Sequence, residues 1–132
     1  MKNAFLSIAL GVSLALATQA GASAQDAAAG EKVFAPCKAC HKIGEGATNS
    51  IGPVLNGVIG RKAGTYAGYP YSDANKNSGF TWDEATFTDY IKDPRAKIPG
   101  TKMIFPGIKD EQKIKDLIAF LKQYDANGKK AQ

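Results

Sequence analysis

The sequence has 132 residues, of which 44% are hydrophobic, and carries 17 Lys and Arg against 12 Asp and Glu, a formal net charge of +5. This length predicts one small domain. The positive residues are interleaved with acidic ones and form no basic arm, which argues against nucleic-acid binding. Two cysteines and one histidine are too few ligands for a structural zinc site.

The first 24 residues have the pattern of a cleaved signal peptide. Lys2 gives a positive start, residues 4–17 form an apolar stretch, and Ala22-Ser23-Ala24 has the small-x-small form that a signal peptidase recognises. The apolar stretch is shorter than the roughly 20 residues of a spanning helix, so cleavage is favoured over a membrane anchor. We therefore predict a leader over residues 1–24, export to the periplasm, and a single mature domain over residues 25–132 without a membrane span.

A first helix is predicted over residues 26–36, and it runs into the pentapeptide Cys37-Lys38-Ala39-Cys40-His41. Two thiols spaced i and i+3 on one helical turn face the same way. They can form thioethers with the two vinyl groups of a haem, while the histidine that follows reaches the iron. The pattern predicts one c-type haem attached through Cys37 and Cys40, with His41 as an iron ligand.

The same two cysteines have an alternative interpretation as a dithiol redox pair. Thiol redox motifs of this kind usually accompany a strand, helix, strand pattern, and no such alternation is found in this sequence. Free thiols and no covalent haem in the exported protein would support the alternative.

Residues 43–71 show no sustained hydrophobic period and are rich in Gly, Asn and Thr. A loop of this length inside a compact domain normally has a function, and wrapping a flat cofactor would be one. A short helix is predicted over residues 72–77.

The second half of the chain predicts more helix. Thr81 and Glu84 have the spacing of a capping box, which predicts a helix over residues 82–92, and Pro94 can open another short turn. The clearest helical pattern covers residues 110–125, where the apolar positions are Ile114, Leu117, Ile118, Leu121 and Tyr124. The sequence therefore predicts an all-α fold with three main helices, one or two short helices and long loops.

Residues 101–108 form an extended apolar segment that contains Met103. Because Met1 would leave with the leader, Met103 is the methionine available as a second iron ligand, although a lone methionine often only fills a gap in the core. An iron held by His41 and Met103 passes electrons and binds little else. An open sixth position would instead suit a haem enzyme or gas sensor, such as a peroxidase.

Over residues 25–126 the chain resembles the class I c-type cytochromes, which include bacterial cytochrome c-two and mitochondrial cytochrome c. The motifs that carry the resemblance are Cys37-Lys38-Ala39-Cys40-His41, Gly52-Pro53-Val54-Leu55-Asn56-Gly57, Gly60-Arg61-Lys62-Ala63-Gly64, Tyr71-Ser72-Asp73-Ala74-Asn75, Trp82, Tyr90 and Ile98-Pro99-Gly100-Thr101-Lys102-Met103-Ile104-Phe105. The resemblance implies the cytochrome c fold around a covalent haem c whose iron ligands are His41 and Met103.

The resemblance also implies roles for residues around the haem. The Pro53 carbonyl would accept a hydrogen bond from His41. The residues around the haem propionates would be Arg61, Tyr71 and Trp82, and a polar network beside the Met103 sulfur would contain Asn75, Tyr90 and Thr101. On the residues alone, the aromatic side chains could equally be ordinary core, and Arg61 a solvated loop charge.

The function implied is that of a monomeric electron carrier and not an enzyme, passing one electron at a time by outer-sphere transfer. Its partners would be redox proteins such as a cytochrome bc complex and a terminal oxidase, a photosynthetic reaction centre or a dehydrogenase. The steering charges would be Lys38, Lys42, Arg95, Lys97, Lys102 and Lys109. Some positions that are lysine in mitochondrial relatives differ here, for example Ser50 and Asp110, so the basic ring is thinner.

Overall fold

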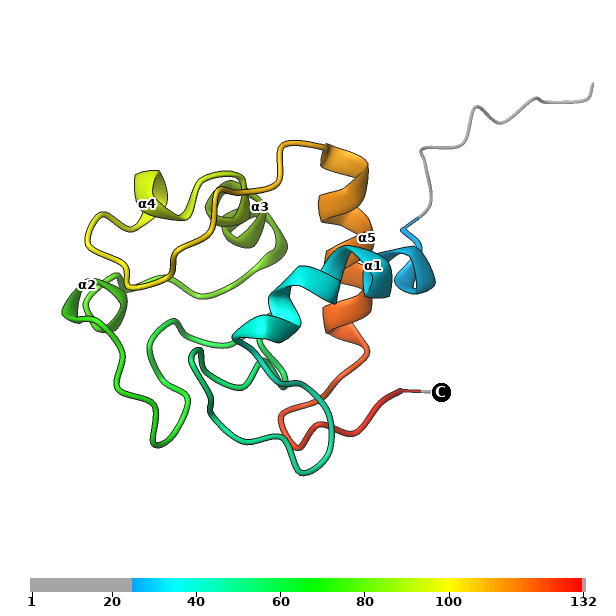
Figure 1. Cartoon of the computed structure of the whole chain (residues 1–132), viewed down its shortest axis with the longest axis horizontal. Coiled ribbons are helices and arrows are strands. Elements are labelled where there is room, and N and C mark those ends of the chain that lie inside the picture. Colours follow the sequence, from blue (N-terminus) through cyan, green and yellow to red (C-terminus); the bar gives the residue numbers. More distant parts are fainter. Residues whose placement is uncertain (1–24, 132) are drawn as a thin grey trace, which may run out of the picture.

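The computed structural model describes residues 25–131, and the predicted leader over residues 1–24 lies outside the described part. Helices joined by long loops make up the fold (Figure 1). The elements are α1 (Ala27–Phe34), the 3-10 helix η1 (Ala35–Ala39), α2 (Asp73–Lys76), α3 (Glu84–Lys92), α4 (Pro94–Lys97) and α5 (Glu111–Lys122). Within residues 25–131, β-pairing between chain segments is limited to two isolated bridges. The all-α prediction is confirmed, with α1, α3 and α5 as the three main helices.

The crossing of α1 and α5 forms the main helix contact of the fold (Figure 1). The Phe34 and Phe120 rings lie with their centroids 5.0 Å apart, and both side chains are buried. The predicted apolar stripe of α5 is buried at Ile114, Leu117, Ile118 and Leu121, while Tyr124 is only partly buried. Gly30 lies where the two helices approach most closely, because a methyl group there would lie 2.8 Å from Phe120 Cβ.

The first helix is shorter than the predicted range of residues 26–36. It ends at Phe34 and continues as the 3-10 helix η1, with Pro36 in its first turn. Proline has no N–H to donate, and in an α-helix its ring would meet the carbonyl four residues earlier. At the other end, the Asp26 carboxylate caps α1 by accepting from the N–H groups of Ala28 and Ala29.

The predicted capping box at Thr81 is wrong. Helix α3 begins at Glu84, and its cap is Asp83, whose carboxylate accepts from the Thr86 N–H at 2.7 Å. Thr81 instead forms an antiparallel bridge with Lys62, which holds it in an extended conformation. Because Lys62 is distant in sequence, the local pattern could not reveal this competing contact.

We expect the stability of the protein to depend on pH through Asp83. The hydrogen bond from the Thr86 N–H holds the pKa of this carboxyl below its usual value. Its contribution is therefore present above the ordinary aspartate pKa of about 4 and is lost as the pH falls through the lower pKa of the folded state. Thermal melts of Asp83→Ala should show a melting temperature a few degrees lower at neutral pH, with the difference shrinking in acid. Asp83→Asn is the control, because it keeps a capping oxygen that does not titrate. An Asp83→Ala difference that stayed constant down to strong acid would contradict this role.

No helix within residues 25–131 combines the length and the apolar character that crossing a bilayer requires.

Candidate haem site

The two thiols of the attachment motif lie on one tight turn. The N–H groups of Cys40 and His41 both donate to the Cys37 carbonyl, at 3.1 and 2.9 Å. Both thiols are free and partly buried. Burial raises the pKa of the Cys37 thiol. A dithiol redox site needs the opposite, a depressed thiol pKa, so this environment argues against the alternative of a thiol oxidoreductase.

His41 is held with one ring nitrogen engaged. Its Nδ1 lies 2.8 Å from the Pro53 carbonyl oxygen. Since a carbonyl can only accept, Nδ1 carries the proton and Nε2 keeps its lone pair, which is the form that binds a metal. Burial lowers the pKa of His41, which also favours the neutral ring. The contact with Pro53 implied by the resemblance is thus present in the structure.

Gly52 packs closely against the His41 ring. A methyl group at Gly52 would lie 2.7 Å from Nδ1 and 2.9 Å from Nε2, so a side chain there would displace the imidazole. The Gly52 N–H donates to the Cys40 carbonyl at 2.7 Å, which ties the glycine to the attachment turn. Sequence reasoning missed this role, and the only local signal was a glycine directly before Pro53.

Met103 is oriented by a hydrogen bond to its sulfur. The Tyr90 hydroxyl donates to Met103 Sδ at 2.9 Å, and the Met103 N–H donates to Thr101 Oγ1 at 3.3 Å. Burial raises the pKa of Tyr90 to about 12, so the phenol remains a donor at neutral pH. The third residue of the implied network, Asn75, makes no hydrogen bond to Tyr90, Thr101 or Met103 among the described contacts.

The loop that carries Met103 is fastened to the end of α3. The Ile108 N–H donates to the Ile91 carbonyl at 2.8 Å, and the Lys109 ammonium donates to the Lys92 carbonyl. Gly107 has a φ of +102° and sits so near Lys92 that a methyl group would lie 2.8 Å from its carbonyl carbon. The charge of Lys109 predicts a steering role, but these contacts make it a capping group for α3.

Arg61 is partly buried. It donates to the carbonyls of Asn56 and Val54 at 3.0 and 3.2 Å, and its Cζ lies 5.1 Å from the centroid of the Tyr66 ring. Burial lowers the pKa of Arg61. Its Nε is buried without a partner, and no carboxylate of residues 25–131 forms an ion pair with it.

A second buried polar atom without a partner is Asn75 Oδ1. Buried polar groups are normally hydrogen-bonded, and buried charges are normally paired. Two such groups in one small domain fit a ligand that brings anionic and polar atoms of its own. The propionates of a haem are anionic and could pair with the guanidinium of Arg61. The residues present therefore fit a haem.

The aromatic residues named from the resemblance lie in two groups. Trp82 is buried against Tyr90, with ring centroids 4.7 Å apart. The Tyr71 hydroxyl accepts from the Tyr66 N–H at 3.1 Å. Burial raises the pKa of Tyr71, so its hydroxyl proton is retained for donation.

Sequence reasoning also missed Asn56, which is buried. Its side chain accepts from the Gly44 N–H at 2.8 Å and donates to the Gly44 carbonyl at 3.0 Å. This pair of bonds closes the loop that follows the attachment turn. An asparagine in a loop is too common for its sequence to indicate such a role.

Comparison with known proteins agrees with this geometry. The family model described as Cytochrome c matches residues 27–125. Cytochrome c2 of Blastochloris viridis is 60% identical over 93% of this chain and 97% of that protein. Cytochrome c-550 of Bradyrhizobium diazoefficiens is 65% identical over 78% of this chain and 76% of that protein. Among solved structures, cytochrome cH from Methylobacterium extorquens is 57% identical and superposes with a TM-score of 0.69, covering 74% of this chain and 97% of that one.

These matches, taken with the paired thiols on one turn, account for both cysteines as the points of attachment of one haem c. The chain therefore belongs to the cytochrome c family.

Proposed function

We propose that this protein is a periplasmic electron carrier whose haem iron is ligated by His41 and Met103. Bound haem c supplies a one-electron couple in which no substrate bond is made or broken. The observation that carries the proposal is the hydrogen bond from Tyr90 to Met103 Sδ. A methionine whose sulfur is held in place, on a loop fastened to α3, is suited to keep the sixth position filled.

The protein's own residues tune this site through the two ligands. The Pro53 carbonyl orients the His41 ring and makes its free nitrogen a better donor. The hydrogen bond from Tyr90 draws electron density from the sulfur and so favours the reduced state. The guanidinium of Arg61 is positioned to compensate for a buried carboxylate of the cofactor.

We expect Tyr90→Phe to lower the reduction potential while the fold is retained. Losing a hydrogen bond worth roughly 1.5 kcal/mol or less corresponds to a drop of up to about 60 mV for a one-electron couple. Redox titration of the haem-loaded protein measures this directly. Tyr124→Phe, a hydroxyl removed from the end of α5, is the control and should leave the potential unchanged. An unchanged potential in Tyr90→Phe would show that the sulfur does not respond to this hydroxyl.

The proposed periplasmic location rests on the predicted leader. The proposed partners are the redox proteins named from the resemblance, which would dock through an acidic face.

Three of the predicted steering charges are engaged within the protein. Lys97 pairs with Asp89 at 3.5 Å, Lys102 donates to the Pro70 carbonyl at 3.1 Å, and Lys109 caps α3. The three whose side chains make no hydrogen bond or ion pair with another described residue are Lys38, Lys42 and Arg95. Lys38 lies within the attachment turn and Lys42 directly follows it, so they are the best placed to steer a partner toward the haem.

The experiment that tests the electron-carrier role is the rate of electron transfer to an acidic redox partner as a function of ionic strength. We expect the rate to fall as salt increases, because screening weakens steering. The double variant Lys38→Gln/Lys42→Gln should be several-fold slower at low salt and less sensitive to it. Lys129→Gln/Lys130→Gln changes the net charge equally in the C-terminal tail and should behave as the parent. Rates that are flat with salt, or equally slowed by both double variants, would contradict docking at the attachment turn.

Optical titration of the haem-loaded protein with carbon monoxide separates this proposal from a haem enzyme or gas sensor. A filled sixth position should bind the gas weakly and slowly. Fast, tight binding would contradict ligation by Met103.

A further inference from the structure

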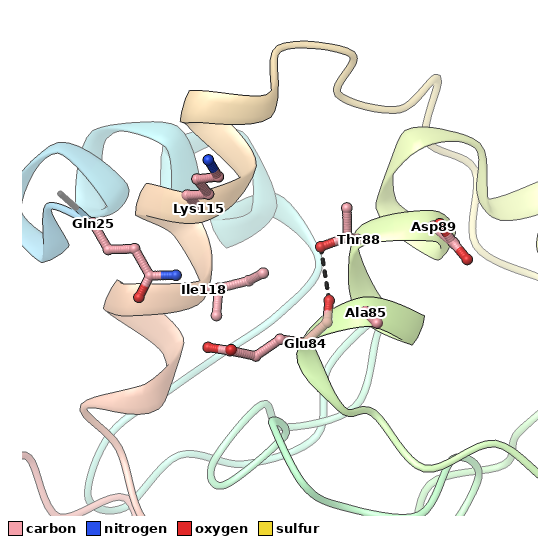
Figure 2. A pocket seen from close by; sticks show the side chains of 7 residues that line it. All are labelled: Gln25, Glu84, Ala85, Thr88, Asp89, Lys115 and Ile118. Carbon is pink, nitrogen blue, oxygen red and sulfur yellow. Dashed lines mark hydrogen bonds between the residues drawn. The ribbon is translucent and has the colours of Figure 1, made fainter. Parts of the chain in front are cut away.

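An open hollow lies between α3 and α5 (Figure 2). Glu84 points from α3 toward α5 and pairs with Lys122 at 3.1 Å, and both side chains are about half exposed. An ion pair this exposed contributes little to stability. The end of α5 is held more firmly by the residues that follow it.

Residues 123–131 fold back on themselves as a hairpin after α5, which we call the 123–131 hairpin. Tyr124 and Lys130 form an antiparallel bridge, and the Ala131 N–H donates to the Gln123 carbonyl at 2.7 Å. The Lys130 ammonium also lies 6.0 Å from the centroid of the Tyr124 ring. The backbone beyond α5 is therefore paired, and its turn has a defined place in the fold.

Asp125 closes the turn of the hairpin. Its Oδ1 accepts from the N–H groups of Asn127 and Lys129, at 2.9 Å each. Its own N–H donates to the Lys129 carbonyl at 3.1 Å, and its carbonyl accepts from the Gly128 N–H at 2.9 Å. Aspartate side chains often hold turns through bonds of this kind to nearby backbone groups. The shape of the hairpin therefore depends on Asp125, and two of these bonds need its side-chain oxygen.

The hairpin packs against the loop that follows the attachment turn, near the end of the chain (Figure 1). Gly128 is buried, and a methyl group on it would overlap the Gly44 carbonyl and lie 2.6 Å from Asn56 Nδ2. The Gly57 N–H donates to the Tyr124 carbonyl at 3.2 Å. The hairpin thus fastens the loop near both of its ends.

The fastened loop supplies the carbonyl groups that hold two residues of the haem site. The Pro53 carbonyl holds His41, and the carbonyls of Val54 and Asn56 hold Arg61. All three carbonyls belong to the four residues from Pro53 to Asn56. A shift of this short stretch would therefore move His41 and Arg61 together.

We propose that Asp125 is a positioning residue for the haem site, which acts through the 123–131 hairpin on the loop that holds His41 and Arg61. Asp125 makes no hydrogen bond to either residue. Its effect is to keep the hairpin closed, so that the loop carbonyls stay where the imidazole and the guanidinium need them. The inference rests on the proposed ligation of the iron by His41.

The test is hydrogen exchange in the reduced, haem-loaded protein, followed by NMR. We expect the His41 Nδ1 proton to exchange about tenfold faster in Asp125→Ala than in the parent, because the loop opens more often. The Leu117 amide, in the buried part of α5, should be accelerated far less. Equal acceleration at both positions would mean a general loss of stability and would overturn the proposal, as would an unchanged rate at His41.

Two control variants separate the hydrogen bonds of Asp125 from other effects. Asp125→Asn removes the same charge but keeps Oδ1 as an acceptor, so the His41 proton should exchange as in the parent. Lys122→Gln removes the ion pair with Glu84 just before the hairpin and should also leave this proton unaffected. Exchange at His41 as fast in either control as in Asp125→Ala would contradict the role of the Asp125 hydrogen bonds.

Failure of this inference is distinguishable from failure of the proposed function. The proposed function would fail in the parent protein, as a ferric spectrum without a charge-transfer band from sulfur to iron. The positioning role of Asp125 would fail only in the comparison between the parent and its variants.

Discussion

Replacing Gly30 with alanine should lower the free energy of unfolding by about 3 kcal/mol, in spite of the roughly 1 kcal/mol that alanine gains over glycine inside a helix. The new methyl group would lie 2.5 Å from the Asp116 carbonyl carbon and closer still to its oxygen, with Phe120 Cβ at 2.8 Å. Two of these atoms belong to the backbone of α5, which cannot give way as a flexible side chain would. Helix α1 must therefore move away from α5 and open the core around Phe34.

Denaturant unfolding of the haem-loaded protein measures this effect. Gly79→Ala is the matched control, since nothing lies within 4 Å of its new methyl group and only the positive φ of +74° opposes the change. That strain is worth about 1 kcal/mol. A Gly30→Ala loss no larger than that of Gly79→Ala would show that α1 and α5 are not in backbone contact.

Gly52→Ala should displace the proposed iron ligand His41, although His41 itself is not mutated. The methyl group would lie within 3 Å of both His41 ring nitrogens, so the ring must turn and stretch its bond to Pro53, or the backbone must shift. Overpacking of this kind costs about 1–3 kcal/mol of stability. Because the ring is the proposed ligand, we also expect a changed absorption spectrum of the haem.

Ile51→Ala controls for Gly52→Ala, because Ile51 is the adjacent residue and is 73% exposed. It should change stability by less than about 0.5 kcal/mol and leave the spectrum intact. If Gly52→Ala gave the parent's spectrum and stability, the close packing of Gly52 on His41 would be contradicted.

Patterns within a few residues of each other predicted much of the fold. The stripe from Ile114 to Leu121 predicted α5, and the attachment motif predicted a turn that presents two thiols, because each feature depends on spacing along one helix. The failures have non-local causes. Thr81 had the right spacing for a cap, but its bridge to Lys62 left Asp83 to start α3.

The site was predictable as a set of residues and not as a set of contacts. The resemblance named Arg61 and Asn75, but only the structure reveals that each has a buried polar atom without a partner. It also named Lys109 for its charge, whereas the fold uses that charge to cap α3. Such assignments depend on which groups the tertiary structure brings together, and charge alone cannot predict them.

The absorption spectrum of the exported protein, recorded in its oxidised and reduced forms, tests the central claim most directly. We expect the bands of a single covalent haem c that interconvert on one-electron reduction, with a ferric charge-transfer band from sulfur to iron that disappears in Met103→Ala. A protein without haem absorbance, or one whose ferric form lacks the sulfur-to-iron band, would contradict the account.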